Sequence, residues 1–157
     1  MPKNKRIIVG IDGSKYAEAA LDKAIEFAKS HDASIHIVNI YNESLQIQTR
    51  VASYSEQQVD EARKKAIEPL LKKYAEKVTS SGLKVDANII VVPGSPGSGL
   101  VDTAEKECAM MIVVGVRGLR RIRRKTMGRV SKYVVAHSPC DVLVVANSPY
   151  DMLIVKP

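Results

Sequence analysis

The stretch MIVVGVRGLRRIRRKTMGRVS, from Met111 to Ser131, determines how the rest of the chain is interpreted. It opens with an apolar run, Met111 to Val114, of the length and bulk expected of a buried strand. Glycines follow at Gly115, Gly118 and Gly128, and a helical pattern of apolar residues begins after the last of them. A strand, a glycine-rich loop and a helix N-terminus in this order are typical of phosphate sites, because glycines let the backbone approach an anion and the helix N-terminus favours negative charge.

The basic charge of the chain is concentrated in this stretch. The sequence has 24 Lys or Arg and 17 Asp or Glu, a formal net charge of +7. Eight of the basic residues and none of the acidic ones lie between Gly115 and Lys132, which leaves 16 basic against 17 acidic residues, a formal −1, elsewhere. We therefore expect an anion site at this loop. The charge alone leaves open whether the anion is a nucleotide, a nucleic acid or a partner protein.

Length and composition are those of one globular domain, with 157 residues of which 45% are hydrophobic and 26% charged. We predict a single domain over residues 1–147, with residues 148–157 as a C-terminal extension of it. Cys108 and Cys140 show no metal or disulfide spacing and are predicted to be reduced core thiols. The polar N-terminus and the absence of a long apolar run predict a cytoplasmic protein without membrane contact.

Strand and helix patterns alternate along the chain, which predicts an open parallel sheet with helices on both faces. The expected strands cover residues 6–11, 33–40, 84–92, 111–114 and 141–146, and a tail strand is expected at 152–155. Ser14 is placed to cap the first helix. Ligands of such sheets bind at the carboxyl ends of the strands, so the loops after the first and fourth strands should converge.

The second helix is the least regular of the predicted elements. Its expected buried stripe begins near Glu56 and comprises Val59, Ala62, Ala66, Leu70, Tyr74 and Val78. Pro69 lies inside this stripe and should kink the helix or divide it in two, because proline lacks the N–H that the helix needs.

Four segments together resemble the universal stress protein family. They are IIVGIDGS at 7–14, PGSP at 93–96, IVVGVRG at 112–118 and MGRVSKYVVAHSPCDVLVV at 127–145. They occur in the family's order and cover the chain apart from its tail. The resemblance implies a Rossmann-like α/β fold, an open five-stranded parallel sheet of order 3-2-1-4-5, that usually forms a homodimer through its fifth strands, here Asp141–Ala146. The tail strand would then cross to the partner or cover this sheet edge itself.

The ATP-binding branch of that family carries the motif G-x2-G-x9-G-[S/T]. Gly115, Gly118 and Gly128 have both spacings, whereas Arg129 stands where the family has Ser or Thr. Loss of one neutral hydrogen bond costs about 1 kcal/mol, and a guanidinium can bind phosphate in two places. The resemblance thus implies an adenine nucleotide as cofactor, either ATP or another such as AMP or cyclic AMP. Mg2+ could accompany it, with Asp12 as the nearest protein group.

Carried over residue by residue, the resemblance places Asp12 near the ribose and Ile40 beside the adenine. The residues around Gly115 would line the ribose and phosphates, and the segment from Gly128 would offer its helix N-terminus. Taken alone, Asp12 is as well explained as a cap of the turn that follows it. The full candidate site is Gly10, Ile11, Asp12, Ile40, Gly115, Arg117, Gly118, Gly128, Arg129, Val130 and Ser131.

Two functions of different classes fit these features. The first is a nucleotide-binding regulatory protein of stress response that changes partner affinity or dimer geometry, and is no enzyme or at most a very slow ATPase. The alternative is an interaction module that docks an acidic protein through the Arg-rich loop, Arg120–Lys125. Nucleic acid ranks lower, because this loop contains no aromatic residue for base stacking. His31, His36 and His137 lack ligand spacing and are read as structural or surface residues.

Overall fold

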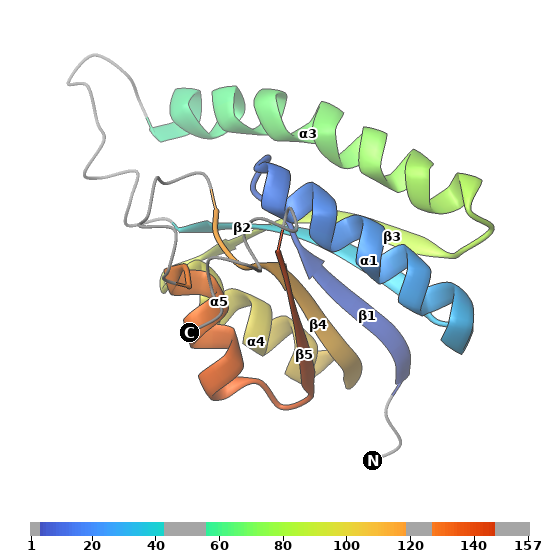
Figure 1. The fold of residues 1–157 in the computed structure, drawn as a ribbon. Coiled ribbons are helices and arrows are strands. Elements are labelled where there is room, and N and C mark those ends of the chain that lie inside the picture. Colours follow the sequence, from blue (N-terminus) through green and yellow to red (C-terminus); the bar gives the residue numbers. More distant parts are fainter. Residues whose placement is uncertain (1–3, 43–55, 119–126, 147–157) are drawn as a thin grey trace.

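A computed structural model describes residues 4–42, 56–118 and 127–146 of the chain (Figure 1). Its elements are β1 (Asn4–Gly10), α1 (Lys15–His31), β2 (Ser34–Asn42), α3 (Glu56–Ser80), β3 (Val85–Val92), α4 (Pro96–Lys106), β4 (Ala109–Gly115), α5 (Arg129–His137) and β5 (Asp141–Val145). The five strands are all parallel, in the order β3-β2-β1-β4-β5. This confirms the predicted fold. The expected tail strand at 152–155 and the Arg-rich loop lie outside the described residues.

Helices cover both faces of the sheet, α1 and α3 on one side and α4 and α5 on the other (Figure 1). Alternate residues of β1 therefore enter different cores: Ile7 and Val9 pack with α1 and α3, and Ile8 packs with α4 and α5. All three are fully buried. A strand covered on both faces has no solvent side, which explains the unbroken apolar runs in the sequence.

The helix α1 confirms the predicted cap and close packing. The Ser14 hydroxyl accepts a hydrogen bond from the N–H of Ala17 at 3.1 Å, which satisfies one of the donors at the helix start. Ala20, Ala24 and Ala28 are fully buried against the sheet. Their small side chains let the helix axis lie close to the strands.

The helix α3 departs from its prediction in which residues it buries. It is one helix that contains Pro69, so of the two predicted alternatives the division into two segments is excluded. Ala62 and Ala66 are exposed, whereas Leu71 is buried with Tyr74 and Val78. Ile67 and Leu70 are partly buried against the core, so within the described residues α3 packs on the sheet from about Ile67 onward. Pro69 is itself exposed, and water can bond the carbonyl group that its missing N–H leaves without a partner.

Two further findings concern the cysteines and the membrane. Cys108 and Cys140 are free, as predicted, but half-buried rather than in the core, because each lies just before a strand, at the rim of the sheet. Within the described ranges no helix has the length and apolarity needed to cross a membrane.

Candidate functional site

The loops that follow β1 and β4 meet at the carboxyl edge of the sheet, as the sequence predicts. These two strands are neighbours at the centre of the sheet, where the strand order reverses. A Cβ on Gly118 would lie only 2.5 Å from Oδ2 of Asp12. The Asp12 carboxylate therefore fills the space beside Gly118, and residues 106 positions apart share one site.

Asp12 has a structural role as well as a place in this site. Its Oδ1 accepts a hydrogen bond from the N–H of Ser14 at 2.9 Å and so shapes the turn into α1. The capping role that the sequence suggests is thus present. Because Oδ1 is engaged in the turn, Oδ2 is the oxygen that lies against Gly118.

Gly115 is required by close packing against the first turn of α1. A Cβ on Gly115 would lie 2.6 Å from Cβ of Tyr16 and 2.7 Å from its backbone carbonyl carbon. Arg117 lies nearby, only 6% exposed, with its guanidinium carbon 5.7 Å from the centre of the Tyr16 ring. Tyr16 therefore supports the start of the glycine-rich loop at two points, through contact and through a cation–π interaction.

Hydrogen bonds close the long loop between β4 and α5 at its base. The carbonyl oxygen of Val116 accepts from the N–H of Gly128 at 2.8 Å and from the Ser131 hydroxyl at 3.0 Å. The same hydroxyl lies 3.0 Å from the carbonyl oxygen of Gly128. Ser131 is 1% exposed, so its side chain ties the loop to α5 rather than facing a ligand.

Gly128 differs from the other two motif glycines, because neither its conformation nor its packing demands glycine. It caps α5 with φ −67° and ψ 164°, angles that any residue adopts. A Cβ there would lie 3.4 Å from Cα of Arg117 and from the carbonyl oxygen of Val116, ordinary contact distances. After it, Arg129 is exposed and Val130 half-buried on the first turn of α5.

The remaining candidates lie at the ends of β1 and β2. Gly10 and Ile40 both face α4: a Cβ on Gly10 would lie 2.8 Å from Cδ1 of Leu100, and Cγ2 of Ile40 lies 2.7 Å from the position of a Cβ on Gly99. Ile11 is buried just beyond β1. The structure thus gathers the candidates along one edge, with Asp12 and the glycine-rich loop at its centre.

Three residues outside the predicted site contribute to this edge. Tyr16 supports the loop, Asn39 bonds to Ile11, and Tyr74 of α3 faces the acidic side chains of the α1 region. Burial raises the pKa of Tyr74 above its usual 10.0, and the nearby carboxylates of Glu18 and Asp12 raise it further. The one available signal was Asn39, a polar residue inside an otherwise apolar strand.

The described residues do not form a metal centre at this site. Among residues 4–42, 56–118 and 127–146, no three His, Cys, Asp or Glu side chains lie close enough to hold a metal ion. Asp12 is the carboxylate that faces the loop, so a Mg2+ ion here would need most of its ligands from phosphate oxygens and water.

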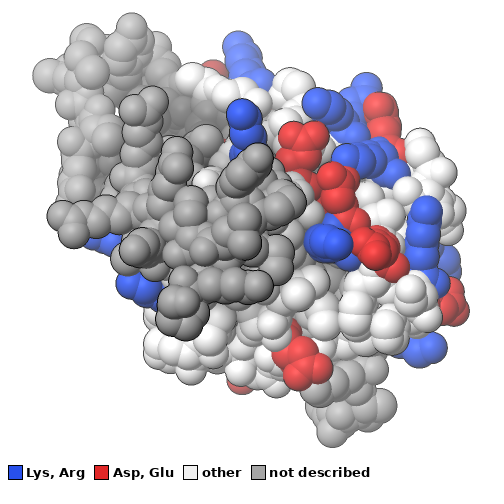
Figure 2. Space-filling view, viewed as in Figure 1, with Lys and Arg blue, Asp and Glu red and all other residues white. Residues whose placement is uncertain are grey.

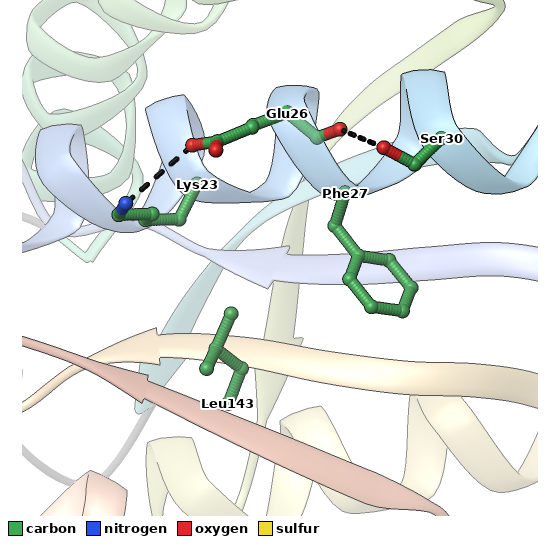
Figure 3. Close-up of a pocket in the computed structure, with 5 residues that line it drawn as sticks. All are labelled: Lys23, Glu26, Phe27, Ser30 and Leu143. Atoms are coloured by element: carbon green, nitrogen blue, oxygen red, sulfur yellow. Dashed lines mark hydrogen bonds and ion pairs between the residues drawn. The ribbon is translucent and has the colours of Figure 1, made fainter.

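Charges of both signs occur on the described surface. On the face that Figure 2 shows, Lys and Arg side chains alternate with Asp and Glu. An open groove of about 220 Å³ lies between α1 and β5, lined by Lys23, Glu26, Phe27, Ser30 and Leu143 (Figure 3). Phe27 and Leu143 make its walls apolar, and its polar residues bond to one another rather than into the groove. It lies beside β5, the last strand of the described sheet.

These features define a class: a doubly wound α/β domain with a glycine-rich loop that leads into a helix N-terminus where the strand order reverses. Comparison with known proteins narrows the class to a family. The model of the universal stress protein family matches residues 3–146, and the chain belongs to that family. A putative universal stress protein of Staphylococcus epidermidis is 38% identical over 145 residues, which cover 89% of this chain and 82% of the relative.

Solved structures share the fold. A universal stress protein in complex with cAMP superposes with a TM-score of 0.68 at 25% identity, covering 94% of this chain and 100% of the other. A universal stress protein from Archaeoglobus fulgidus in complex with dAMP superposes with a TM-score of 0.63 at 21% identity, covering 88% and 95%. The second likeness is evidence of fold alone.

Proposed function

We propose that this chain binds an adenine nucleotide at the edge between β1 and β4, and that binding regulates its association with a partner or a second copy. The phosphates would lie at the N-terminus of α5, where the first backbone N–H groups of a helix have no partner within the helix. The ribose would lie near Asp12. Arg129, exposed on the first turn of α5, would take the place of the family's hydroxyl by contacting a phosphate with its guanidinium.

The observation that carries this proposal is the glycine at 128. Packing explains Gly115, which contacts Tyr16, and the Asp12 carboxylate explains Gly118. Against the described residues Gly128 has just enough room for a methyl group, and its backbone angles are ordinary, so these neighbours do not require glycine there. A glycine at the cap keeps the helix N-terminus open to an anion, which is a functional reason for the residue.

The family adds support from outside the chain. Two solved members are complexes with cAMP and dAMP, both adenine nucleotides. We infer the same ligand class here, with ATP, AMP and cyclic AMP as the candidates. Mg2+ would be held chiefly by the phosphates, with Asp12 as its protein neighbour.

A regulatory role fits the site better than catalysis. Ser131 donates its hydroxyl to the backbone, and Asp12 uses one oxygen in a turn, so among the described residues of the site neither is a strong candidate to orient an attacking water. We therefore expect hydrolysis to be absent or very slow. Partner exchange or a change in dimer geometry would then carry the signal.

A second function rests on a separate observation, the eight basic residues between Gly115 and Lys132. In this alternative the chain holds no nucleotide, and the Arg-rich loop docks an acidic protein. The two functions predict different effects of a bulky residue at Gly128. Such a residue should prevent nucleotide binding but should not affect docking through the Arg-rich loop, because docking there does not need an open helix N-terminus.

The test begins with the freshly purified protein, which is denatured so that released small molecules can be identified by mass spectrometry. Titration calorimetry with ATP, ADP, AMP and cyclic AMP follows, on the wild-type chain and on Gly128→Ala and Gly128→Val. We expect micromolar binding of at least one nucleotide by the wild type and its loss in the valine variant, with unchanged thermal stability. Absence of any released nucleotide and of any binding heat would contradict the proposal and favour the docking alternative.

A further inference from the structure

Asn39 in β2 holds the backbone of Ile11 from the side of the neighbouring strand. The N–H of Ile11 donates to the carbonyl oxygen of Val38 at 2.9 Å, which extends the β1–β2 pairing one residue past β1. The carbonyl oxygen of Ile11 accepts from Nδ2 of Asn39 at 2.8 Å. Both peptide groups that flank Ile11 are thereby attached to β2, one by its backbone and one by this side chain.

The other end of the Asn39 side chain is costly to the fold. Asn39 is 2% exposed, and its Oδ1 has no hydrogen-bond partner in the described part of the chain. A buried acceptor without a partner destabilises a protein by about 1 to 3 kcal/mol. Leucine would remove this unpaired oxygen but would leave the Ile11 carbonyl oxygen without its donor, so the two residues differ less in stability than in what they do to the Ile11 peptide.

The bond from Asn39 acts on the residue that faces the glycine-rich loop. The carbonyl group of Ile11 belongs to the same planar peptide unit as the N–H and Cα of Asp12, so holding it also holds the position of the Asp12 Cα, from which the side chain starts. That side chain has little tolerance, because its carboxylate must reach both the Ser14 N–H and the space beside Gly118. A small rotation of the Ile11 peptide would break one of these contacts.

We propose that Asn39 is a positioning residue: by holding the Ile11 peptide it keeps the Asp12 carboxylate beside Gly118, and through Asp12 it contributes to nucleotide affinity. The inference rests on the proposed nucleotide function. Asparagine supplies an N–H for the Ile11 carbonyl group, but it also places an oxygen without a partner in the interior. Leucine and aspartate at this position would both lack the N–H.

A double-mutant cycle separates positioning from a structural role. The variants are Asn39→Leu, Asp12→Ala and the two combined, with affinity measured by calorimetry for whichever of ATP, ADP, AMP and cyclic AMP the wild type binds most tightly. We expect Asn39→Leu to weaken binding by about tenfold or more while its thermal midpoint stays close to that of the wild type. In the Asp12→Ala background the same substitution should change affinity less than about twofold, because a residue that acts through Asp12 has no further effect once Asp12 is removed.

Asn88→Leu, at an exposed position, is the control for the change from asparagine to leucine. It makes the same change on the neighbouring strand β3, where Asn88 bonds to His36 and not to the loop after β1. This control should bind as the wild type does. A crystal structure of Asn39→Leu should show the Asp12 carboxylate displaced from Gly118, which is a readout that does not depend on ligand.

The outcomes distinguish the two levels of the proposal. If the wild type binds a nucleotide and Asn39→Leu binds it equally well, the positioning role is wrong and the nucleotide function stands. Additive losses in the cycle would also overturn it, since they mean that Asn39 acts independently of Asp12. If the wild type binds no nucleotide, the proposed function is wrong, and so is the proposed role of Asn39 in nucleotide binding.

Discussion

The Asp12 carboxylate lies against the backbone of Gly118, so close that a Cβ on Gly118 would be 2.5 Å from Oδ2. We predict that Gly118→Ala displaces the carboxylate, which is the end of a flexible side chain, and leaves the backbone in place. Nucleotide affinity should fall by about tenfold or more, as expected for the loss of a charged hydrogen bond of about 1.5 to 3 kcal/mol. Calorimetry and thermal denaturation of the same sample would test this, and a large drop in stability would show that the backbone moves instead.

Gly115 and Gly128 belong to one motif but should respond differently to alanine. At Gly115 the new methyl group would meet the Tyr16 backbone at 2.7 Å, and overpacking of this kind costs about 1 to 3 kcal/mol. At Gly128 the contacts are 3.4 Å or longer, so the free energy of unfolding should change by less than about 0.5 kcal/mol. Urea denaturation of both variants measures the difference. Equal losses would mean that Gly128 has a packing role that its contacts do not reveal.

Tyr74 should make the protein sensitive to alkaline pH. Burial and the nearby carboxylates raise the pKa of its hydroxyl in the folded state above the unfolded value of 10.0. Between these two pKa values the unfolded chain releases the proton first, so stability is retained below the unfolded pKa and falls as pH rises toward the folded pKa. In Tyr74→Phe the fall should be shallower. Urea midpoints measured over this pH range would test the prediction, and parallel curves for the two proteins would contradict it.

His36 is predicted to stabilise the fold without affecting the ligand site. It is 5% exposed, with Nδ1 2.9 Å from Oε2 of Glu107 and Nε2 2.8 Å from Oδ1 of Asn88. His36→Ala should lower the free energy of unfolding by about 1 to 3 kcal/mol, because it breaks a buried polar network. His31→Ala, at an exposed position on α1, is the control and should cost much less. Nucleotide affinity should be unchanged in both variants, and a loss of affinity in His36→Ala would link this network to the site.

The open edge of β5 is the predicted contact between two copies. Within the described residues β5 pairs with β4 only, and the apolar groove formed by Phe27 and Leu143 lies beside it. Leu143→Lys should shift the protein toward monomer in sedimentation equilibrium. Val135→Lys is the control, because Val135 on α5 is already 53% exposed. A dimer that survives Leu143→Lys would place the contact elsewhere, and a chain ending at Asn147 would show whether the tail contributes.

Local patterns in the sequence were sufficient for the type and order of the elements, whereas the strand order came from the family resemblance. Unbroken apolar runs predict strands covered on both faces, and the spacing of Gly115, Gly118 and Gly128 predicts a loop that leads into a helix. These two patterns are visible in the sequence because each has a local cause. Burial on both faces requires apolar residues in a strand, and close approach of two backbone segments requires glycine. The same reasoning erred at Ala62 and Ala66, since periodicity marks a helical face without showing whether anything packs on it.

The sequence by itself determined the order of the elements, the motif and the position of the charge. Only the tertiary structure decided which residues meet: Asn39 with Ile11, Asp12 with Gly118, and Tyr16 with Gly115 and Arg117. It also distinguished Gly115, which the packing requires, from Gly128, which it does not. The physical reason is that contacts between residues far apart in the chain depend on strand order and register, and these follow from the packing of all the elements together rather than from any one segment.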